Sequence, residues 1–480
     1  MIKSVGIDLA GNGEHKVRCL DEKAEVCDSF GFETTPVGLE KLEERIFRDG
    51  SNPVVVFEPT GLAWVAVAVY LRARHPGCCL VRTQSRNVAA LRKYLRHSSK
   101  SDKIDAITLA KMPFVNAERL NEVYLPPAKI YAIQRLARQR KRLENDMASR
   151  KKRIISIIDG YLPGVHAAFS SRWSLQANAF LRCRLNPLAI VRDGEKTLDR
   201  FLTNARYRRQ KDAVESHSVY MACQAAATIY QRSQEAGMID DDFFAALQEE
   251  IVHELRLMEA EEAESQSITQ RLTKLYQELY PSDNLSTIPG IGPHTAPIFL
   301  AVVGDPSRFP NQSAFANYNG VVPNSKQSSD TEAKGLNMTK AGPSVMKWAL
   351  YQSGQIGRRY DPQLAHLYYR EMVHNGKNHK QAMGAVMSHL GTRILAVLRD
   401  DKPYELRDIK GDPITWRDAR ELVLSNYQVP EEIKRDRRRR GTLKNSGSKL
   451  VRKRRETVAR RVPEAAETPQ SAAATSSPGN

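Results

Sequence analysis

Four carboxylates near the N-terminus have the residue types and positions that a metal-dependent reaction on a phosphate requires. Asp8 lies inside the apolar run SVGIDLAG (4–11), where burying a carboxylate is costly unless a positive group compensates it. Glu58 ends the apolar run of NPVVVFEPTG (52–61). Asp102 and Asp105, in SDKIDA, are three residues apart, so a helix places both on one face. The question is whether these four side chains converge.

Converging carboxylates would repel one another and raise one another's pKa values unless a cation were present. Mg²⁺ prefers oxygen ligands, and two such ions can flank an in-line phosphoryl displacement. Taken alone, each feature is weak, because a DxxD pair is most often a solvated helix face and an Asp in a strand is often satisfied by backbone donors. The conjunction of all four in one α/β region favours a two-metal site formed by Asp8, Glu58, Asp102 and Asp105.

The elements that must position these carboxylates alternate in a definite order. Three β-rich runs are followed by a helix and then by alternating strands and helices, which predicts a β-β-β-α-β-α-β-α sequence. The expected strands are 4–11, 15–21, 24–32, 52–61 and 78–83, and the expected helices are 38–47, 62–74 and 85–94. This order is that of an α/β RNase H-like sheet. Its first and fourth strands are neighbours, which would put Glu58 beside Asp8.

A competing interpretation fits the first strand. VGIDLAGNG is similar to the first phosphate-binding hairpin of actin-like sugar kinases and chaperone ATPases. That family requires a second glycine-rich phosphate hairpin with its own aspartate and a glycine-rich turn at the adenosine. The sequence has neither, and its strongly basic charge and long helical insertion also argue against this interpretation.

A long helical region follows the α/β region. Residues 129–158 carry apolar side chains at helical spacing over many turns, and residues 240–280 do the same with an acidic bias. Two such helices can pair as an antiparallel coiled coil, which would serve dimerisation. Between them, residues 169–205 indicate a small helical subdomain interrupted at Asn186-Pro187.

A third unit begins near residue 285 and extends to about residue 404. In its IPGIG turn (288–292), Gly290 and Gly292 would allow backbone N–H groups to approach a phosphate, as in helix-hairpin-helix DNA modules. A simple helix-capping turn explains the same five residues equally well. Four aromatic residues of this unit are candidates for stacking on bases, although aromatics at helical spacing are more often core: Trp348, Tyr351, Tyr368 and Tyr369.

The charge of the chain indicates a polyanionic partner. The 480 residues contain 73 Lys and Arg against 55 Asp and Glu, a net charge of +18, which favours DNA or RNA over a membrane surface. Residues 434–461 contribute +12 of this, including Arg437, Arg438, Arg439 and Arg440. We expect this tail to bind nucleic-acid backbone. The alternative is a merely solubilising tail. Residues 463–480 are expected to be disordered.

Localisation and redox state follow from what the sequence lacks. No run approaches the length of a membrane span and no signal peptide is evident, so we expect a cytoplasmic protein. The six cysteines form neither a CxxC pair nor a zinc-like cluster, which predicts reduced, mostly buried thiols.

Several separate motifs resemble those of one family. GIDLA, VVFEPTG and SDKIDA match the DEDD set of the IS110 insertion-sequence transposases, and residues 286–323, 338–343 and 375–405 follow the pattern of their second domain. The resemblance covers residues 1–405. It implies a RuvC-like metal domain joined by a coiled coil to a domain with a nucleophilic serine. It further implies Mg²⁺, a structured guide RNA transcribed from the element, and a homo-oligomer.

The position of the serine follows from the same resemblance. Counting from Pro323 leads to Ser328, but the chain has SSD where the family usually has SG, and one extra residue before Thr339, so Ser329 stays an alternative. Lys340, in MTKAGP, is a candidate contact to the DNA backbone. A serine hydroxyl is a poor nucleophile unless its proton is removed or the attacked phosphate is polarised.

The sequence therefore predicts a DNA transposase-recombinase divided into four parts. These are a metal domain (1–125), a helical dimerisation region (126–280), a serine-bearing domain (281–420) and a basic, then disordered, tail (421–480). One alternative is a metal-dependent nuclease in which water attacks. Another is a non-catalytic nucleic-acid-binding derivative of such an element.

Overall fold

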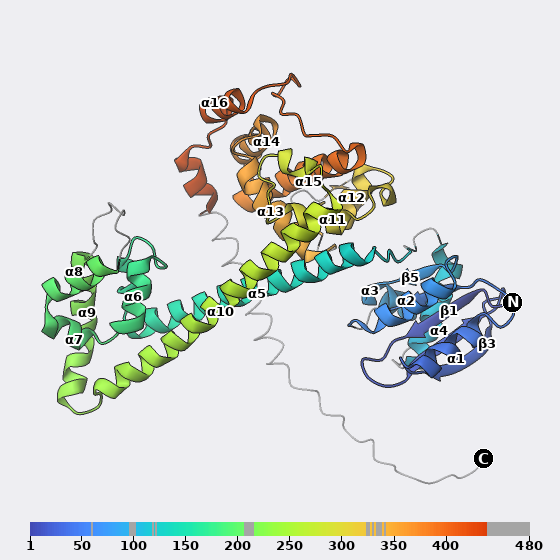
Figure 1. Cartoon of the computed structure of the whole chain (residues 1–480), viewed down its shortest axis with the longest axis horizontal. Coiled ribbons are helices and arrows are strands. Elements are labelled where there is room, and N and C mark those ends of the chain that lie inside the picture. Colours follow the sequence, from blue (N-terminus) through green and yellow to red (C-terminus); the bar gives the residue numbers. More distant parts are fainter. Residues whose placement is uncertain are drawn as a thin grey trace, which may run out of the picture. The chain divides into compact units, whose positions relative to one another are not determined.

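The computed structural model describes most of the chain. It covers residues 1–58, 61–95, 102–117, 120, 122–205, 216–322, 327–328, 331–332, 338–339 and 342–438, and for 327–328 and 331–332 the backbone alone. These residues form two compact units, Met1–Pro127 and Ala128 onward (Figure 1). Each unit is described separately below.

The first unit is built on a mixed five-stranded sheet. The strands are β1 (Ser4–Asp8), β2 (His15–Leu20), β3 (Val26–Phe32), β4 (Val54–Phe57) and β5 (Leu80–Arg82), in the order β3-β2-β1-β4-β5. β1, β2 and β3 pair antiparallel, whereas β1, β4 and β5 are parallel. The order of these elements along the chain and the pairing of β1 with β4 are as predicted from the sequence, and the arrangement fits an RNase H-like domain.

Helices cover both faces of this sheet. They are α1 (Pro36–Ile46), α2 (Ala63–Arg74), α3 (Ser85–Tyr94) and α4 (Asp102–Asn116). Ile7 and Phe57 face the core with α1 and α2, whereas Val56 and Val81 pack with Leu109 of α4 on the other face. Because side chains alternate along a strand, β1 and β4 each send every second residue to the α4 side.

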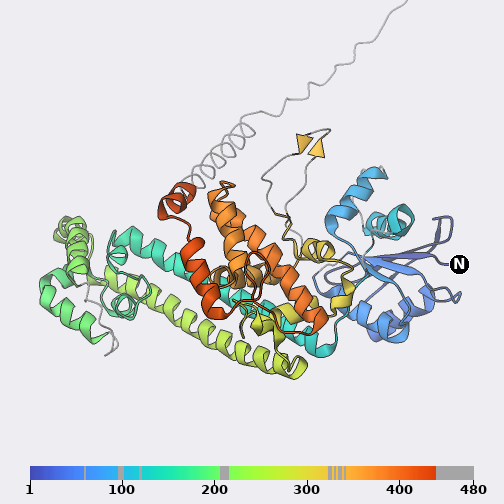
Figure 2. The ribbon, with the colours of Figure 1, turned by 90° about the horizontal axis from the view of Figure 1, so that it is seen from above.

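Two long antiparallel helices form the spine of the second unit. α5 (Ala128–Tyr161) and α10 (Asp241–Leu279) run side by side in both Figure 1 and Figure 2. Lys129 pairs with Glu278 at one end, and Arg150 pairs with Glu254 and Glu261 further along, which fixes the antiparallel direction.

A helical subdomain packs on the end of the spine where α5 finishes and α10 begins. Its members are α6 (Leu175–Cys183), α7 (Pro187–Asp193), α8 (Glu195–Asn204) and α9 (Ser216–Glu235). Ile158 of α5, Phe180 of α6 and Ile251 of α10 are almost fully buried in its core. The Asn186 side chain caps α7 by accepting hydrogen bonds from the Leu188 and Ala189 N–H groups.

The remaining helices pack on the other end of the spine. They are α11 (Ala296–Val303), α12 (Gln312–Asn319), α13 (Ser344–Gly357), α14 (Pro362–Val373), α15 (His379–Asp400) and α16 (Trp416–Asn426), together with the short strand pair β6 (Gln327–Ser328) and β7 (Thr331–Glu332). α15 is central, because Leu390 and Ile394 are fully buried in the core that also contains Ile133 of α5.

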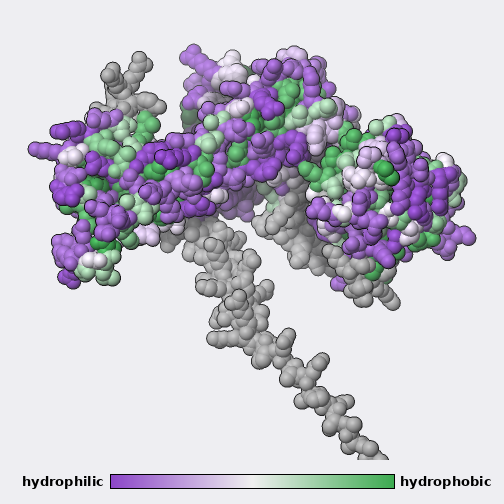
Figure 3. All heavy atoms as spheres, turned by 60° about the horizontal axis from the view of Figure 1, so that its bottom comes forward, coloured by the Kyte–Doolittle hydropathy of each residue, from purple (hydrophilic) through white to green (hydrophobic). Residues whose placement is uncertain are grey.

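The surface is largely polar, and the thiols are less buried than the sequence predicted, because Cys27 and Cys183 are exposed. No helix of the described residues is long and apolar enough to cross a membrane, and the face drawn in Figure 3 is largely hydrophilic. All six cysteines are free thiols. Three are buried (Cys19, Cys78 and Cys223), and burial raises the pKa of each to about 12.

Candidate active site

Asp8 and Glu58 end two neighbouring parallel strands. In the β1–β4 register Ile7 lies opposite Phe57. The residues that follow, Asp8 and Glu58, therefore lie side by side at the carboxyl ends of the two strands. On the other side of β1, Lys16 of β2 lies opposite Asp8, and its ammonium is ion-paired with Glu14. The sheet therefore brings the first two predicted carboxylates to adjacent strand ends.

Gly6 brings α4 onto the same face of the sheet. A Cβ at Gly6 would overlap the carbonyl oxygen of Ala106 and the backbone nitrogen of Ala110, so only glycine allows this approach. Asp8 is two residues beyond Gly6, and Glu58 is two residues beyond Val56, which packs against α4. By strand alternation both carboxylates belong to the α4 side of the sheet.

Asp102 and Asp105 lie in the first turn of α4, and their surroundings differ. Asp105 immediately precedes Ala106, which places it next to β1. Its side chain is 9% exposed and is ion-paired with Arg92 of α3. Asp102 and Lys103 are exposed. Asp105 is therefore neutralised within the protein, whereas Asp102 remains accessible at the helix start, where the helix dipole favours a negative charge.

The chemistry of these four carboxylates suits a divalent cation, but their side chains are not arranged to bind one. Carboxylate oxygens are the ligands that Mg²⁺ prefers. Among the described residues, however, no three Asp, Glu, His or Cys side chains gather closely enough to hold a metal ion. The ion pair of Asp105 with Arg92 accounts for part of this, because it turns that carboxylate toward α3.

Arg92, the ion-pair partner of Asp105, is a residue that the sequence did not point to. It faces Asp105 because α3 packs against α4. The only sequence signal is a basic residue at the end of a helix that precedes an acidic helix start, and this is common in loops between helices. A pairing partner thirteen positions away could not be chosen without the fold.

The serine region is described only in part. β6 and β7 pair antiparallel, with Ser328 opposite Thr331. The Thr339 N–H donates to the Val322 carbonyl at 3.0 Å, which holds residue 339 against the end of the segment that follows α12. Ser329 and Lys340 lie outside the described residues.

The IPGIG turn gives its two glycines different environments. Gly290 has φ +87°, and a Cβ there would meet the carbonyl of Ser353 and, at 2.6 Å, the nitrogen of Gly357 in α13. Gly290 thus allows close packing of two backbones. A Cβ at Gly292 would meet nothing within 4 Å, and the Gly292 carbonyl accepts from Ala296 at 2.9 Å at the start of α11.

The other predicted nucleic-acid contacts are partly engaged inside the protein. Tyr368 is buried, and its hydroxyl contacts His379 at 2.8 Å. Arg437 has a side chain that is 16% exposed and lies 3.4 Å from Asp436, whereas Arg438 is exposed. Trp348, Tyr351 and Tyr369 are partly buried against the core of α11–α15. Arg439 and Arg440 lie outside the described residues.

Comparison with known families decides what kind of protein carries this arrangement. Residues 5–163 match the model of the IS110-type DEDD domain, described as "Transposase". Residues 282–370 match the model described as "Transposase IS116/IS110/IS902 family". The chain belongs to the IS110 family of transposases. The two matched segments contain Asp8, Glu58, Asp102 and Asp105 in the first and the IPGIG turn in the second.

Individual relatives agree with this assignment. The 43.6 kDa protein of insertion element IS110 from Streptomyces coelicolor is 24% identical over 84% of this chain and 95% of its own length. The 44.8 kDa protein of insertion element IS116 from Streptomyces clavuligerus is 21% identical over 83% and 95%. A pilin gene-inverting protein of Moraxella lacunata is 31% identical over 30% of this chain and 47% of its own length.

This IS110-family chain is thus an insertion-sequence transposase-recombinase, an enzyme whose substrate is DNA. The DEDD family to which its first unit belongs suggests dependence on a divalent metal.

Proposed function

We propose that this transposase cuts and rejoins DNA through a covalent phosphoserine intermediate, with Ser328 as the nucleophile and Ser329 as the alternative. The observation that carries the proposal is the adjacency of Asp8 and Glu58 at the ends of β1 and β4, on the sheet face where α4 begins with Asp102. Carboxylates that converge on a metal ion at these strand ends would suit phosphoryl transfer. The serine itself rests on the family pattern of the second unit.

The proposed cleavage is a substitution at phosphorus. The serine Oγ forms a bond to the phosphorus of a DNA phosphodiester, and the bond from phosphorus to one sugar oxygen breaks. The serine proton passes to water, and the departing sugar oxygen takes up a proton. Attack by a sugar hydroxyl of another DNA end on the phosphoserine reverses these steps, releases the serine and joins the new strands.

The acidic residues would hold Mg²⁺ during this reaction. Asp8, Glu58, Asp102 and Asp105 are the proposed ligands, and Asp105 must exchange its partner Arg92 for the metal. Bound Mg²⁺ would neutralise charge on the attacked phosphate. Asp8 and Glu58, at the ends of adjacent strands, would bind the metal at the sheet. The other two ligands, Asp102 and Asp105, would come from the first turn of α4.

Further parts of the proposal concern partners. A structured guide RNA would pair with the donor and target DNA, and the chain would act as a homo-oligomer, a dimer or a tetramer, through the α5–α10 region. Lys340, Gly290, Gly292 and Arg437–Arg440 would contact nucleic-acid backbone. The net charge of +18 supports a polyanionic partner, and it favours RNA and DNA alike.

A trapped adduct tests the serine chemistry. The full chain is incubated with Mg²⁺, guide RNA and radiolabelled DNA, and protein–DNA adducts are separated on denaturing gels. We expect an adduct in the parent protein and in one of the variants Ser328→Ala and Ser329→Ala, and none in the other. Mass spectrometry of the DNA-linked peptide then identifies the serine. Full cleavage by the double variant without any adduct would establish attack by water instead.

The carboxylates are tested separately from the serine. Asp8→Asn and Asp102→Asn are expected to abolish both the adduct and cleavage, because each removes a charged oxygen ligand. The matched control is Asp21→Asn, at a turn of the same unit, for which activity should be retained. Unchanged DNA processing by Asp8→Asn and Asp102→Asn would favour a non-catalytic nucleic-acid-binding derivative.

A further inference from the structure

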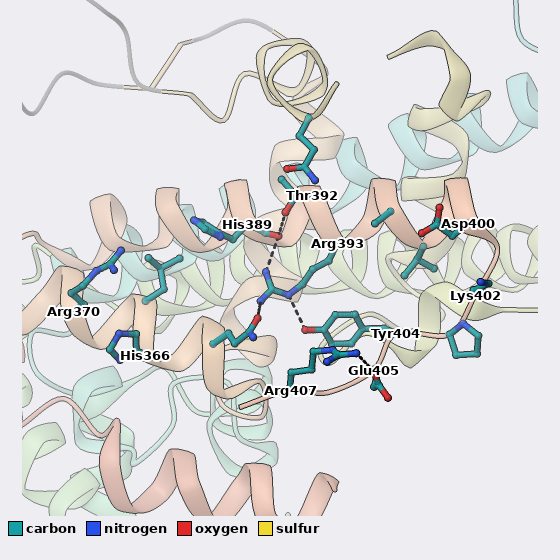
Figure 4. A pocket seen from close by; sticks show the side chains of 16 residues that line it. His366, Arg370, His389, Thr392, Arg393, Asp400, Lys402, Tyr404, Glu405 and Arg407 are labelled. Atoms are coloured by element: carbon teal, nitrogen blue, oxygen red, sulfur yellow. Dashed lines mark hydrogen bonds and ion pairs between the residues drawn. The ribbon is translucent and has the colours of Figure 1, made fainter. Parts of the chain in front are cut away.

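A basic cleft lies between α14 and α15 and is closed at one side by residues 402–407 (Figure 4). Its cavity volume is about 590 Å³. His366 and Arg370 are four residues apart on α14, and His389 and Arg393 are four residues apart on α15, so each pair occupies one helix face. Lys402 and Arg407 come from the closing segment. None of these side chains belongs to the site described above.

Arg393 forms the fixed floor of the cleft. Its Nε donates to the Tyr404 hydroxyl at 2.9 Å, its Nη1 to the His389 carbonyl at 3.0 Å, and its Nη2 to Gln363 at 2.9 Å. Beneath it, the fully buried Asp361 lies 3.3 Å from the Arg393 Nε and accepts from the Tyr404 hydroxyl at 2.8 Å. This network ties α14, α15 and the closing segment together, so the walls are set before any ligand arrives.

The rim of the cleft carries positive side chains that acidic residues of the protein neutralise only in part. The Arg370 side chain is 51% exposed, and its nearest acidic partner, Glu371, is 3.9 Å away. Lys402 is exposed and forms no ion pair with any described residue. Arg407 is paired with Glu405, and Asp400 is the other acidic side chain of the lining. Burial and the positive charges of Arg393 and Arg370 lower the pKa of His389, which reflects the same positive field.

We propose that this cleft binds the sugar-phosphate backbone of a single nucleic-acid strand, with Arg370 and Lys402 contacting its phosphates. The volume lies within the range of about 300–1,000 Å³ typical of small-ligand sites, so the cleft accepts a short stretch of one strand and not a duplex. The uncharged His389, Thr392 and Tyr404 offer polar edges and a ring beside that backbone.

This inference requires the chain to be a nucleic-acid enzyme and does not require the serine chemistry. A DNA strand and an RNA strand offer the same phosphodiester, so both are tested. An acidic protein segment is the competing ligand class. Nucleic acid is favoured because the chain belongs to a family of transposases, whose substrate is DNA, and the displacement assay below tests the acidic segment directly.

Binding is measured on the full chain carrying Ser328→Ala and Ser329→Ala, so that strand cleavage does not complicate the readout. Fluorescence anisotropy with labelled single-stranded DNA, single-stranded RNA and duplex DNA gives affinity at several salt concentrations. The test variant is Arg370→Gln with Lys402→Gln. The control, Lys410→Gln with Arg417→Gln, removes the same two charges from exposed positions of the same unit outside the cleft.

The test variant should bind the single strand at least about 10-fold more weakly and show a salt dependence shallower by about 1.4, since each lost phosphate contact removes about 0.7 from the slope for single strands. The control should change affinity by less than about twofold. The strand type that loses more affinity identifies the natural ligand as DNA or RNA. Equal losses in the test and control variants would overturn the proposal, as would a loss confined to duplex DNA.

Photocrosslinking supplies a second readout that does not depend on a substitution. Single strands that contain iodouracil are irradiated with the same full chain, and the crosslinked peptides are identified by mass spectrometry. Crosslinks within residues 363–370, 389–393 or 402–407 would support the proposal. Crosslinks found only elsewhere, or displacement of the strand by poly-glutamate but not by unlabelled strands, would overturn it.

Discussion

Asp105 of α4 is ion-paired with Arg92 of α3, and both side chains are largely shielded from solvent, at 9% and 20% exposure. The pair supplies the compensating charge that a buried carboxylate requires. It also occupies a carboxylate that the proposed metal site needs. Arg92 therefore holds Asp105 in a form that is stable without metal, and a bound cation would have to replace the guanidinium.

Replacing Arg92 should show whether its guanidinium and a metal ion compete for Asp105. In Arg92→Gln, Asp105 loses its charged partner, so we expect the first unit to be less stable by about 1–3 kcal/mol without divalent cations. Added Mg²⁺ should restore part of this loss. Calorimetric unfolding with and without MgCl₂ measures both effects. Arg86→Gln, an exposed position of the same helix, is the control. If Mg²⁺ stabilised both variants equally, Arg92 and the metal ion would not compete for Asp105.

Gly6 should tolerate no side chain. Gly6→Ala would push a methyl group into the backbone of Ala106 and Ala110, so α4 must move away from β1. We expect a loss of about 1–3 kcal/mol or more, and loss of DNA cleavage because Asp102 and Asp105 move with α4. At Gly11 an added Cβ meets nothing within 4 Å, so Gly11→Ala is the control. Wild-type cleavage by a folded Gly6→Ala variant would contradict a role for α4 in the site.

The sequence predicted the sheet of the first unit because its signals are local. Alternation and apolar runs identify strands, and the RNase H-like order then makes β1 and β4 neighbours, which places Glu58 beside Asp8. The sequence did not indicate that Gly6 is important. Glycine is required there because α4, about a hundred residues later in the chain, approaches β1 closely. Such long-range backbone contacts have no local signature.

The remaining features depend on packing between distant segments. The pairing of Asp105 with Arg92 and the contact of Gly290 with α13 appear only once the helices are in place. The cleft had a weak signal, two basic pairs at helical spacing on consecutive helices, His366 with Arg370 and His389 with Arg393. That pattern is also typical of a solvated helix face. Only the position of the closing segment, residues 402–407, distinguishes a cleft from such a face.

The two glycines of IPGIG should respond differently to alanine. Gly290→Ala combines a left-handed backbone, φ +87°, with a clash against Ser353 and Gly357, so we expect a loss of at least about 2 kcal/mol or failure to fold. Gly292→Ala should change stability by less than about 1 kcal/mol, since a Cβ there has open space. Urea unfolding of the full chain measures both.

The same pair tests the proposed phosphate contact. If the backbone at Gly292 approaches DNA, the added methyl group should weaken DNA binding in Gly292→Ala without a matching loss of stability. Anisotropy with duplex and single-stranded DNA provides the readout. Unchanged DNA affinity in Gly292→Ala would leave the turn with a packing role alone, as the contact of Gly290 with α13 already indicates.

Glu254 should give the spine a defined pH dependence. It lies in the first half of α10, is 4% exposed, and accepts hydrogen bonds from Arg150 at 2.9 Å and from Arg153, both on α5. Burial opposes its ionisation, but the hydrogen bonds and charges of the two arginines outweigh burial and lower its pKa from the ordinary value of 4.5. A lowered folded-state pKa stabilises the fold above the unfolded-state pKa and loses that effect as pH falls through the folded-state value.

Glu254→Gln should therefore destabilise the second unit by about 2 kcal/mol near neutral pH. The difference between the parent protein and this variant should shrink as pH falls below 4.5, because the parent carboxylate then also becomes uncharged. Urea unfolding across this range measures the difference. Glu264→Gln, an exposed position of the same helix, should show little effect at any pH. A difference that stays constant or grows in acid would mean that the Arg150–Glu254 contact owes its stability to packing and not to charge.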